Sequence, residues 1–212
     1  MSEVARLGAV QIRELSVPDS YEITPVKHAD DRGYFLEWYR FDRLEEVVGH
    51  PLDLRQANTS VSKRGSVRGI HFADIPPSQA KYVTAPHGAV LDFVIDIRVG
   101  SPTFGKWDSV LLDDQDRRAI YLGEGLGHCF VALTEGATVS YLVSDVYNPG
   151  REHGINPLDP EVGLEFTLPS DELLLSPKDT EAPTLSEALE RDLLPGWDAA
   201  RGFYASLNVQ KG

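Results

Sequence analysis

The sequence contains a single cysteine, Cys129, among 212 residues. One cysteine forms neither an intramolecular disulfide nor a zinc-type cysteine cluster, so nothing requires an oxidising compartment. No apolar run approaches the roughly 18 residues that a membrane-spanning helix needs. The N-terminal Met1-Ser2-Glu3-Val4 lacks the basic and apolar regions of a secretory signal. We therefore expect a cytoplasmic protein with no membrane partner.

Positive charge is also scarce. The chain has 20 Lys and Arg against 33 Asp and Glu, a formal net charge of −13 at pH 7. This balance excludes a generic nucleic-acid binder. It also means that a phosphorylated ligand needs a local cluster of cationic side chains. Arg32, Arg68 and Lys81 are candidates for such a cluster, although each could be an ordinary solvated surface charge.

Several common cofactor motifs are missing. The sequence has no G-x-x-x-x-G-K-[ST] loop and no G-x-G-x-x-G turn, so neither a phosphate-loop ATPase nor a dinucleotide-binding protein is indicated. No His-x-His pair occurs, although this is the commonest way in which a β-barrel strand presents two imidazoles to a metal. The aspartates at 30–31 and 113–116 are interpreted as turns with Asx hydrogen bonds. We expect no metal.

From about residue 21 to 167, short runs rich in Val, Ile, Tyr, Phe and Thr recur between Gly, Pro and Asp, a pattern typical of an all-β sandwich or barrel. A short helix over Phe41–Val48 interrupts them, because its apolar residues recur three or four apart and Gly49 can end it. The expected strands are Tyr21–Val26, Tyr34–Tyr39, Leu54–Ser62, Val67–Phe72, Lys81–Ala85, Ala89–Arg98, Asp108–Leu112, Ala119–Leu122, His128–Leu133, Thr138–Ser144 and Val162–Thr167.

The C-terminal part of the chain has a different pattern. Thr184 and Glu187 form a capping-box signature after Pro183, which predicts a helix through about Asp192. Residues 183–212 are therefore expected to be a helical appendix. The chain has no internal repeat, low-complexity run or Ser/Gly linker, so residues 1–212 are expected to form a single domain.

Two residues are candidates for proton transfer. His71 ends the segment Gly65-Ser66-Val67-Arg68-Gly69-Ile70-His71, and a barrel-facing imidazole can be a general base near neutral pH. Tyr141 shares a strand face with Val139 and Val143, where its hydroxyl could be a proton donor. A lone strand histidine is more often structural, and a tyrosine among apolar neighbours is more often a core residue.

A longer series of motifs resembles the dTDP-4-dehydrorhamnose 3,5-epimerase family of deoxysugar biosynthesis. The resemblance covers nearly the whole chain and rests on motifs that occur together in one order. These are Asp31-Arg32-Gly33-Tyr34-Phe35-Leu36-Glu37, Gln56-Ala57-Asn58-Thr59-Ser60, Arg68-Gly69-Ile70-His71, Gln79-Ala80-Lys81-Tyr82-Val83, Asp96-Ile97-Arg98, Gly100-Ser101-Pro102-Thr103-Phe104-Gly105-Lys106-Trp107, Gly127-His128-Cys129-Phe130, Tyr141, Tyr147-Asn148-Pro149, Leu175-Ser176-Pro177-Lys178-Asp179 and Ala182-Pro183-Thr184-Leu185.

The resemblance implies a cupin-like jelly-roll β-sandwich or barrel, usually a homodimer. It implies an enzyme that works without metal or organic cofactor on a dTDP-linked 4-keto-6-deoxyhexose. A C–H bond beside a ketone is acidic because its anion delocalises into an enolate. Epimerisation therefore needs a base, a group that stabilises the oxyanion, and an acid on the opposite ring face.

By position in the motifs, His71 resembles the family's base and Asp179 its carboxylate partner. Lys81 resembles the donor that faces the C4 oxygen, and Tyr141 the acid that reprotonates from the other face. The resemblance further implies that the substrate is contacted by eight residues, some of which reach the site of a neighbouring subunit. They are Arg32, Phe35, Glu37, Gln56, Asn58, Arg68, His128 and Tyr147. His128 could equally give packing or hydrogen-bond support.

A regular strand over Val67–Phe72 would direct Arg68 and His71 to opposite faces, whereas both are expected at the ligand. Gly69 could introduce a bend or bulge that removes this conflict. Other functions remain open at this level. They are a mono-epimerase acting at C3 or C5 only in an antibiotic deoxysugar pathway, a cupin 3,4-ketoisomerase, a metal-binding cupin, and a sugar-nucleotide-binding module without activity.

Overall fold

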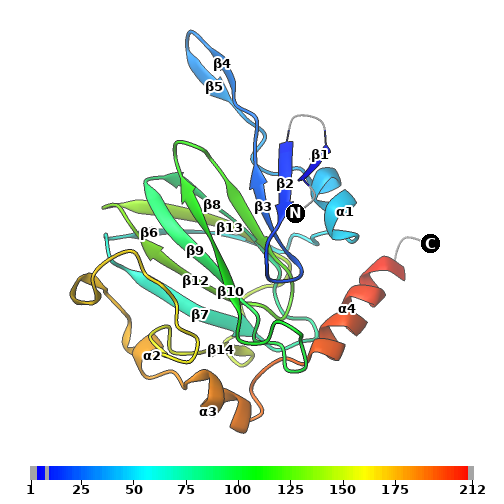
Figure 1. Ribbon diagram of the computed structural model, residues 1–212. Coiled ribbons are helices and arrows are strands. Elements are labelled where there is room, and N and C mark those ends of the chain that lie inside the picture. Colours follow the sequence, from blue (N-terminus) through cyan, green and yellow to red (C-terminus); the bar gives the residue numbers. More distant parts are fainter. Residues whose placement is uncertain (1–3, 8–9, 210–212) are drawn as a thin grey trace.

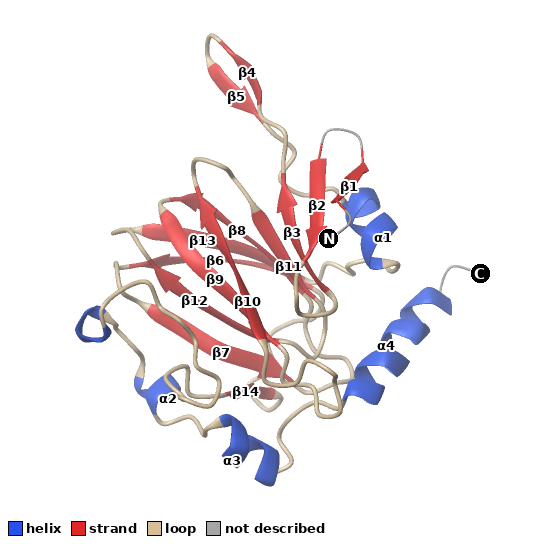
Figure 2. Cartoon of the chain, in the orientation of Figure 1, coloured by secondary structure: helices blue, strands red, loops and turns tan. Residues whose placement is uncertain are grey.

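The computed structural model describes residues 4–7 and 10–209. Two antiparallel β-sheets lie face to face, and most helices lie beyond them in the C-terminal part of the chain (Figures 1 and 2). The expected all-β sandwich is confirmed. No helix within the described residues is long and apolar enough to span a membrane.

The larger sheet has seven strands in the order β1-β2-β3-β11-β8-β13-β6. All neighbouring pairs are antiparallel. The strands are β1 (Val4–Leu7), β2 (Val10–Glu14), β3 (Ser20–Thr24), β11 (Ala119–Leu122), β8 (Lys81–His87), β13 (Ala137–Val143) and β6 (Gln56–Ser62).

The smaller sheet has five strands in the order β10-β9-β12-β7-β14. Two further strands form a separate hairpin that extends away from the body of the molecule (Figure 1). The sheet strands are β10 (Trp107–Asp113), β9 (Ala89–Ile95), β12 (Gly127–Ala132), β7 (Val67–Ala73) and β14 (Glu152–Gly154), and the hairpin strands are β4 (His28–Asp30) and β5 (Gly33–Phe35).

Strand alternation explains why the sheets pack against each other. On β13, Val139 and Tyr141 point inward and meet Val83 of the same sheet, while Val94 and Phe130 of the other sheet face them in one buried cluster. Burial of this apolar area is the main stabilising contribution in such a sandwich. The predicted inward face of Tyr141 is therefore confirmed.

Further apolar clusters cover the outer faces of both sheets. Helix α1 (Phe41–Val48) packs on the larger sheet through Leu44, and it ends at Gly49, as the sequence predicts. The outer face of the smaller sheet is covered by the chain after β14, including Leu185 and Ala188. The remaining helices are a 3₁₀ helix (Ser170–Glu172), α2 (Pro177–Thr180), α3 (Leu185–Glu190) and α4 (Trp197–Val209).

The predicted capping box is confirmed, because Thr184 accepts from the Glu187 backbone and Glu187 accepts from the Thr184 backbone. The expected appendix holds α3 and α4, and its last residues, 210–212, lie outside the described residues.

The strand predicted over Val162–Thr167 is wrong. This segment is irregular and only contributes side chains such as Val162 and Phe166 to the cluster on the smaller sheet, whose edge beside β7 is already occupied by β14. Several other strand predictions also differ from the structure. The predicted Tyr34–Tyr39 strand is reduced to Gly33–Phe35, and β1 and β2 precede the β core expected to begin near residue 21.

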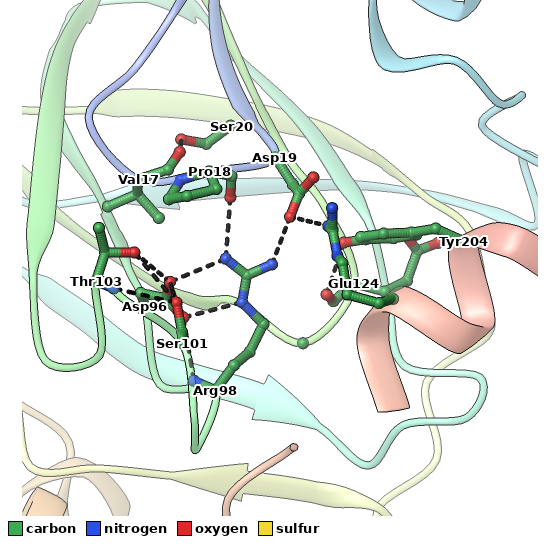
Figure 3. A network of polar contacts seen from close by, with 12 residues as sticks. Val17, Pro18, Asp19, Ser20, Asp96, Arg98, Ser101, Thr103, Glu124 and Tyr204 are labelled. Atoms are coloured by element: carbon green, nitrogen blue, oxygen red, sulfur yellow. Dashed lines mark hydrogen bonds and ion pairs between the residues drawn. The ribbon is translucent and has the colours of Figure 1, made fainter. Parts of the chain in front are cut away.

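A buried arginine contacts both the sandwich and the start of α4 (Figure 3). Arg98 is fully buried and donates to both oxygens of Asp96 and to Asp19. Its guanidinium also lies 4.5 Å from the ring centroid of Trp197 at the start of α4. A buried charge is costly unless it is paired, so the contacts between Arg98 and α4 depend on both carboxylates.

Candidate active site

A cleft between the two sheets holds the residues that the sequence predicts for catalysis. Two adjoining cavities, of about 450 Å³ and 390 Å³, share His71, Lys81, Tyr141 and Lys178 in their walls. Asp179 lines the larger cavity. The structure therefore brings together all four predicted catalytic side chains, which are separated by up to 108 residues in the sequence.

The conflict between Arg68 and His71 is resolved by a bulge at Gly69. His128 pairs with His71 and Phe130 pairs with Arg68, so β7 has one more residue than β12 between the two pairs. Gly69 has a φ of +130°, and a Cβ there would lie 2.4 Å from the His128 carbonyl oxygen. Only glycine fits this position. Arg68 and His71 consequently both line the larger cavity.

His71 forms a pair with a carboxylate. Its Nε2 lies 2.7 Å from Oδ1 of Asp179, which is buried on α2. The other oxygen, Oδ2, accepts from Ser176 Oγ at 2.7 Å. Burial raises the pKa of Asp179, but the hydrogen bonds from His71 and Ser176 outweigh it and hold that pKa below its usual value. Asp179 is therefore an anion at neutral pH, suited to orienting the imidazole and to stabilising its protonated form.

Lys81 begins β8 and is almost completely buried, at 7% exposure. Burial lowers its pKa, and the negative charges of Glu152, Asp92 and Glu124 oppose this effect. Within residues 10–207, whose side chains the structure describes, its ammonium group makes no ion pair within 4 Å. A buried cation without a close partner is suited to meeting negative charge on a ligand.

Tyr141 enters the cleft from the larger sheet, whereas His71 enters from the smaller sheet. The two side chains therefore face the cleft from opposite sides. Burial raises the pKa of the Tyr141 hydroxyl, and Arg68 lowers it to a smaller extent. The hydroxyl is consequently protonated at neutral pH and can donate a proton.

A second histidine and carboxylate pair lies on the neighbouring strand, where His128 pairs with His71. His128 lines the larger cavity, and its Nε2 is 2.9 Å from Oδ2 of the fully buried Asp92. Burial raises the pKa of Asp92, although the contact with His128 partly offsets this. Asp92 therefore fixes the orientation of the His128 ring in the cavity wall.

Three predicted binding residues line the smaller cavity. Gln56 donates to Asn58 at 2.7 Å, and Gln56 also accepts from the backbone of Tyr147 at 3.0 Å. These hydrogen bonds hold the Gln56 amide and the backbone of Tyr147, whose exposed side chain lines the same cavity. Polar groups next to an aromatic ring suit a planar, hydrogen-bonding ligand.

The three remaining predicted binding residues lie outside this cleft, on and after the β4–β5 hairpin (Figure 1). Arg32 is paired with Asp30, and its side chain is 90% exposed. Phe35 is 66% exposed, and Glu37 is paired with Arg40. The structure of one chain therefore does not bring Arg32, Phe35 and Glu37 to the residues with which they are predicted to act.

Comparison with known proteins shows which family the chain belongs to. A sequence profile described as dTDP-4-dehydrorhamnose 3,5-epimerase matches residues 14–187. A dTDP-4-dehydrorhamnose 3,5-epimerase from Mycolicibacterium smegmatis is 54% identical over 92% of this chain and 96% of its own length. The chain belongs to the dTDP-4-dehydrorhamnose 3,5-epimerase family. A dTDP-4-dehydrorhamnose 3-epimerase from Streptomyces niveus is also 54% identical, over 88% of this chain and 89% of its own length.

The family resemblance extends to the fold. The solved structure of the RmlC epimerase of Mycobacterium tuberculosis superimposes with a TM-score of 0.90. Its sequence identity is 51%, over 92% of this chain and 98% of the solved one. The predicted cupin-like fold of this family is thereby confirmed.

Sequence reasoning missed several residues that line the cleft of this epimerase family member. Lys178 lies in both cavity walls and adds a third cation to Arg68 and Lys81. Glu152 lines the smaller cavity and adds a negative charge that acts on Lys81. Lys178 precedes Asp179 in a motif already recognised, so its place in the motif could have indicated it. Nothing in the local sequence indicates Glu152, because β14 reaches the cleft only by pairing with β7.

Within residues 10–207, no group of three or more histidine, cysteine or acidic side chains converges in an arrangement that could hold a metal ion. The expectation of chemistry without a metal remains a prediction.

Proposed function

We propose that the protein epimerises a dTDP-linked 4-keto-6-deoxyhexose at the carbons that flank its C4 ketone, with side chains as its only catalytic groups. Family membership and the names of both relatives support the reaction class and the dTDP-sugar. The observation that carries the assignment of residues is the position of His71 and Tyr141 on opposite sheets of one cleft. Inversion needs a base and an acid on opposite faces of the sugar ring.

His71 is the proposed base. It takes the proton from the carbon beside the ketone, and the electron pair of the C–H bond moves into the enolate. The imidazolium that forms is stabilised by Asp179 at 2.7 Å. Because the sugar loses and regains one proton, the reaction needs no oxidant and no reductant.

Lys81 is the proposed partner of the enolate oxygen. Charge develops on the C4 oxygen as the proton leaves, and a cation in a buried position stabilises this charge far better than one in water. Lys81 meets this requirement because it is 7% exposed and lines the cleft with His71.

Tyr141 is the proposed acid. Its neutral hydroxyl gives a proton to the enolate carbon on the face opposite to His71, which inverts the carbon. A phenol with a raised pKa, as burial produces here, is still acidic enough to protonate a carbanion-like carbon.

Arg68, Lys178, Gln56, Asn58 and Tyr147 are proposed to bind the nucleotide. The two cations suit diphosphate oxygens, and their position in the cleft counters the net charge of −13. His128 is proposed to contact the sugar from the wall of the larger cavity.

We further propose that the protein is a homodimer in which the β4–β5 hairpin of one copy completes the site of the other. The exposure of Arg32 and Phe35, and their separation from the cleft of their own chain, support this arrangement. The compartment is proposed to be the cytoplasm, since the only cysteine is buried and unpaired.

The test is proton NMR of dTDP-4-keto-6-deoxyglucose with the protein in D₂O, following the C3 and C5 signals separately. Loss of both signals indicates a 3,5-epimerase, and loss of one indicates a mono-epimerase. Mono-epimerisation is a specific second candidate, because one relative of 54% identity is named a 3,5-epimerase and another of 54% identity is named a 3-epimerase. Exchange at neither carbon would refute the proposal.

Histidine 71 is tested in the same assay. His71→Ala should abolish exchange and leave dTDP binding, measured by calorimetry, nearly unchanged. Undiminished exchange by this variant would exclude His71 as the base.

A further inference from the structure

A buried carboxyl group lies beside the cleft without being part of its walls. Glu124 is 3% exposed and sits in the turn between β11 and β12. Its Oε1 accepts a hydrogen bond from Ser144 Oγ at 3.0 Å. Its Oε2 is buried and has no hydrogen-bond partner among the described residues. Burial raises the pKa of this carboxyl to about 7, so both protonation states occur near neutral pH.

The hydrogen bond to Ser144 connects Glu124 to the start of β8. Ser144 Oγ accepts from the backbone N–H of Ala80 at 2.8 Å, and the Ser144 N–H donates to the Ala80 carbonyl at 3.1 Å. Ala80 directly precedes Lys81, which pairs with Val143, the neighbour of Ser144. The Glu124 side chain therefore anchors both strand ends at the point where Lys81 enters the cleft.

The backbone of the turn is itself held in place. Tyr204 of α4 donates to the Glu124 carbonyl at 2.8 Å (Figure 3). The flanking glycines donate on either side, Gly123 to the Asp19 carbonyl at 2.9 Å and Gly125 to Ser78 Oγ at 3.0 Å. With its backbone fixed at three consecutive residues, Glu124 has little freedom to withdraw from Ser144.

The charges around the two groups indicate how they influence each other. Lys81 is faced by the carboxylates of Glu152, Asp92 and Glu124, all of which favour its protonated form. Glu124 is itself faced by Asp19, by the hydroxyls of Tyr121 and Tyr204, and by Ser144. Of the three carboxylates that act on Lys81, Glu124 is the one that also holds the backbone of Ala80, next to Lys81, through Ser144.

We propose that Glu124 is a positioning residue for Lys81: through Ser144 it fixes the start of β8, and as a carboxylate it adds to the negative charge around the lysine. This inference rests on the proposed function for the role of Lys81, but the physical link between Glu124 and Lys81 does not depend on it. Glu124 touches neither cavity wall of the cleft, so it acts only through its neighbours.

The two parts of this role are separated by two variants. Glu124→Gln keeps a side chain that can accept from Ser144 but removes the charge. The pKa of Lys81 should then fall, and the alkaline limb of the kcat profile should move to lower pH by about half a unit or more. Ser144→Ala breaks the bond but leaves a carboxyl that is still ionised at alkaline pH, so kcat should fall about 2- to 10-fold while the alkaline limb stays in place. KM should stay within about twofold in both variants.

The matched control is Glu190→Gln, which removes one carboxylate from an exposed position at the end of α3. A purely structural role of Glu124 would lower the melting temperature without moving the alkaline limb. The proposal would be overturned if the alkaline limb of the kcat profile stayed in place in Glu124→Gln, or if it moved equally far in Glu190→Gln.

Direct titration of Lys81 keeps the test independent of catalysis. Lysine labelled with ¹³C at Cε is followed by NMR against pH, and Lys81→Arg assigns the signal. A lower Lys81 pKa in Glu124→Gln than in the wild type and Glu190→Gln supports the link, even if the wild type exchanges no sugar protons. An unchanged Lys81 pKa overturns it, even if the wild type is an active epimerase.

Discussion

Replacing Asp179 with asparagine removes one negative charge from the partner of His71 and leaves the shape of the side chain almost unchanged. The carboxylate accepts from His71 at 2.7 Å, and a hydrogen bond to a charged group contributes about 1.5 to 3 kcal/mol. If the variant loses this contribution when the imidazolium forms, the rate falls by about 10- to 150-fold. The His71 side chain is 38% exposed, so solvent screening favours the lower half of this range.

The assay is the rate of deuterium incorporation into the substrate at fixed pH, together with the affinity for dTDP. We expect exchange to slow about 10- to 30-fold while dTDP binding is retained. Asp171→Asn is the matched control, since Asp171 is an exposed aspartate in the 3₁₀ helix near the same segment. Exchange within twofold of the wild type in Asp179→Asn would show that the imidazole needs no carboxylate partner, and the reasoning would be refuted.

The same variant has a predicted effect on stability. The pKa of Asp179 is lower in the folded protein than its usual value, so its contribution is present above about pH 4 and is lost as pH falls through the folded pKa. Asp179→Asn should therefore melt at a lower temperature than the wild type at pH 7. The difference should shrink as the buffer is acidified, which thermal unfolding at a series of pH values measures.

Two further substitutions test separate parts of the structure. Tyr141→Phe should retain exchange at the carbon facing His71 but yield little inverted sugar, and full inversion in the NMR spectrum would exclude Tyr141 as the acid. Gly69→Ala should destabilise the protein by about 3 kcal/mol or more in urea unfolding, because the added Cβ meets the His128 carbonyl oxygen at 2.4 Å in a backbone conformation with φ of +130°. Wild-type stability of Gly69→Ala would mean that the bulge can relax.

The fold was predictable where local pattern and tertiary role agree. Strict alternation on β13 and the capping box at Thr184 both specify their structure within a few residues, and both predictions are confirmed. The run Val162–Thr167 has the same apolar character as a strand, but its side chains only pack on the smaller sheet, and β14 is the segment that pairs with β7. Apolar composition indicates that a segment is buried. A strand also requires the backbone of a partner strand, and the local sequence does not specify that partner.

The candidate site was predictable in its composition but not in its arrangement. Motifs pointed to His71 and Lys81, yet only the register of β7 against β12 explains how Arg68 joins His71 on one face. Glu124 illustrates what local reasoning misses, because its burial and its bond to Ser144 arise from contacts across 20 residues of sequence. Such contacts are set by the packed fold rather than by local propensity.

The entry of His71 and Tyr141 from opposite sheets has a consequence for the hydrophobic core. Facing sheets lie about 10 Å apart, a spacing set by the volume of the side chains packed in the layer that joins them. Here Val83, Val94 and Phe130 belong to that layer. The thickness of the core thus determines the gap across which the proposed base and the proposed acid must reach one carbon atom. Under the proposed mechanism, the volume of these apolar side chains therefore affects the reaction as well as the stability.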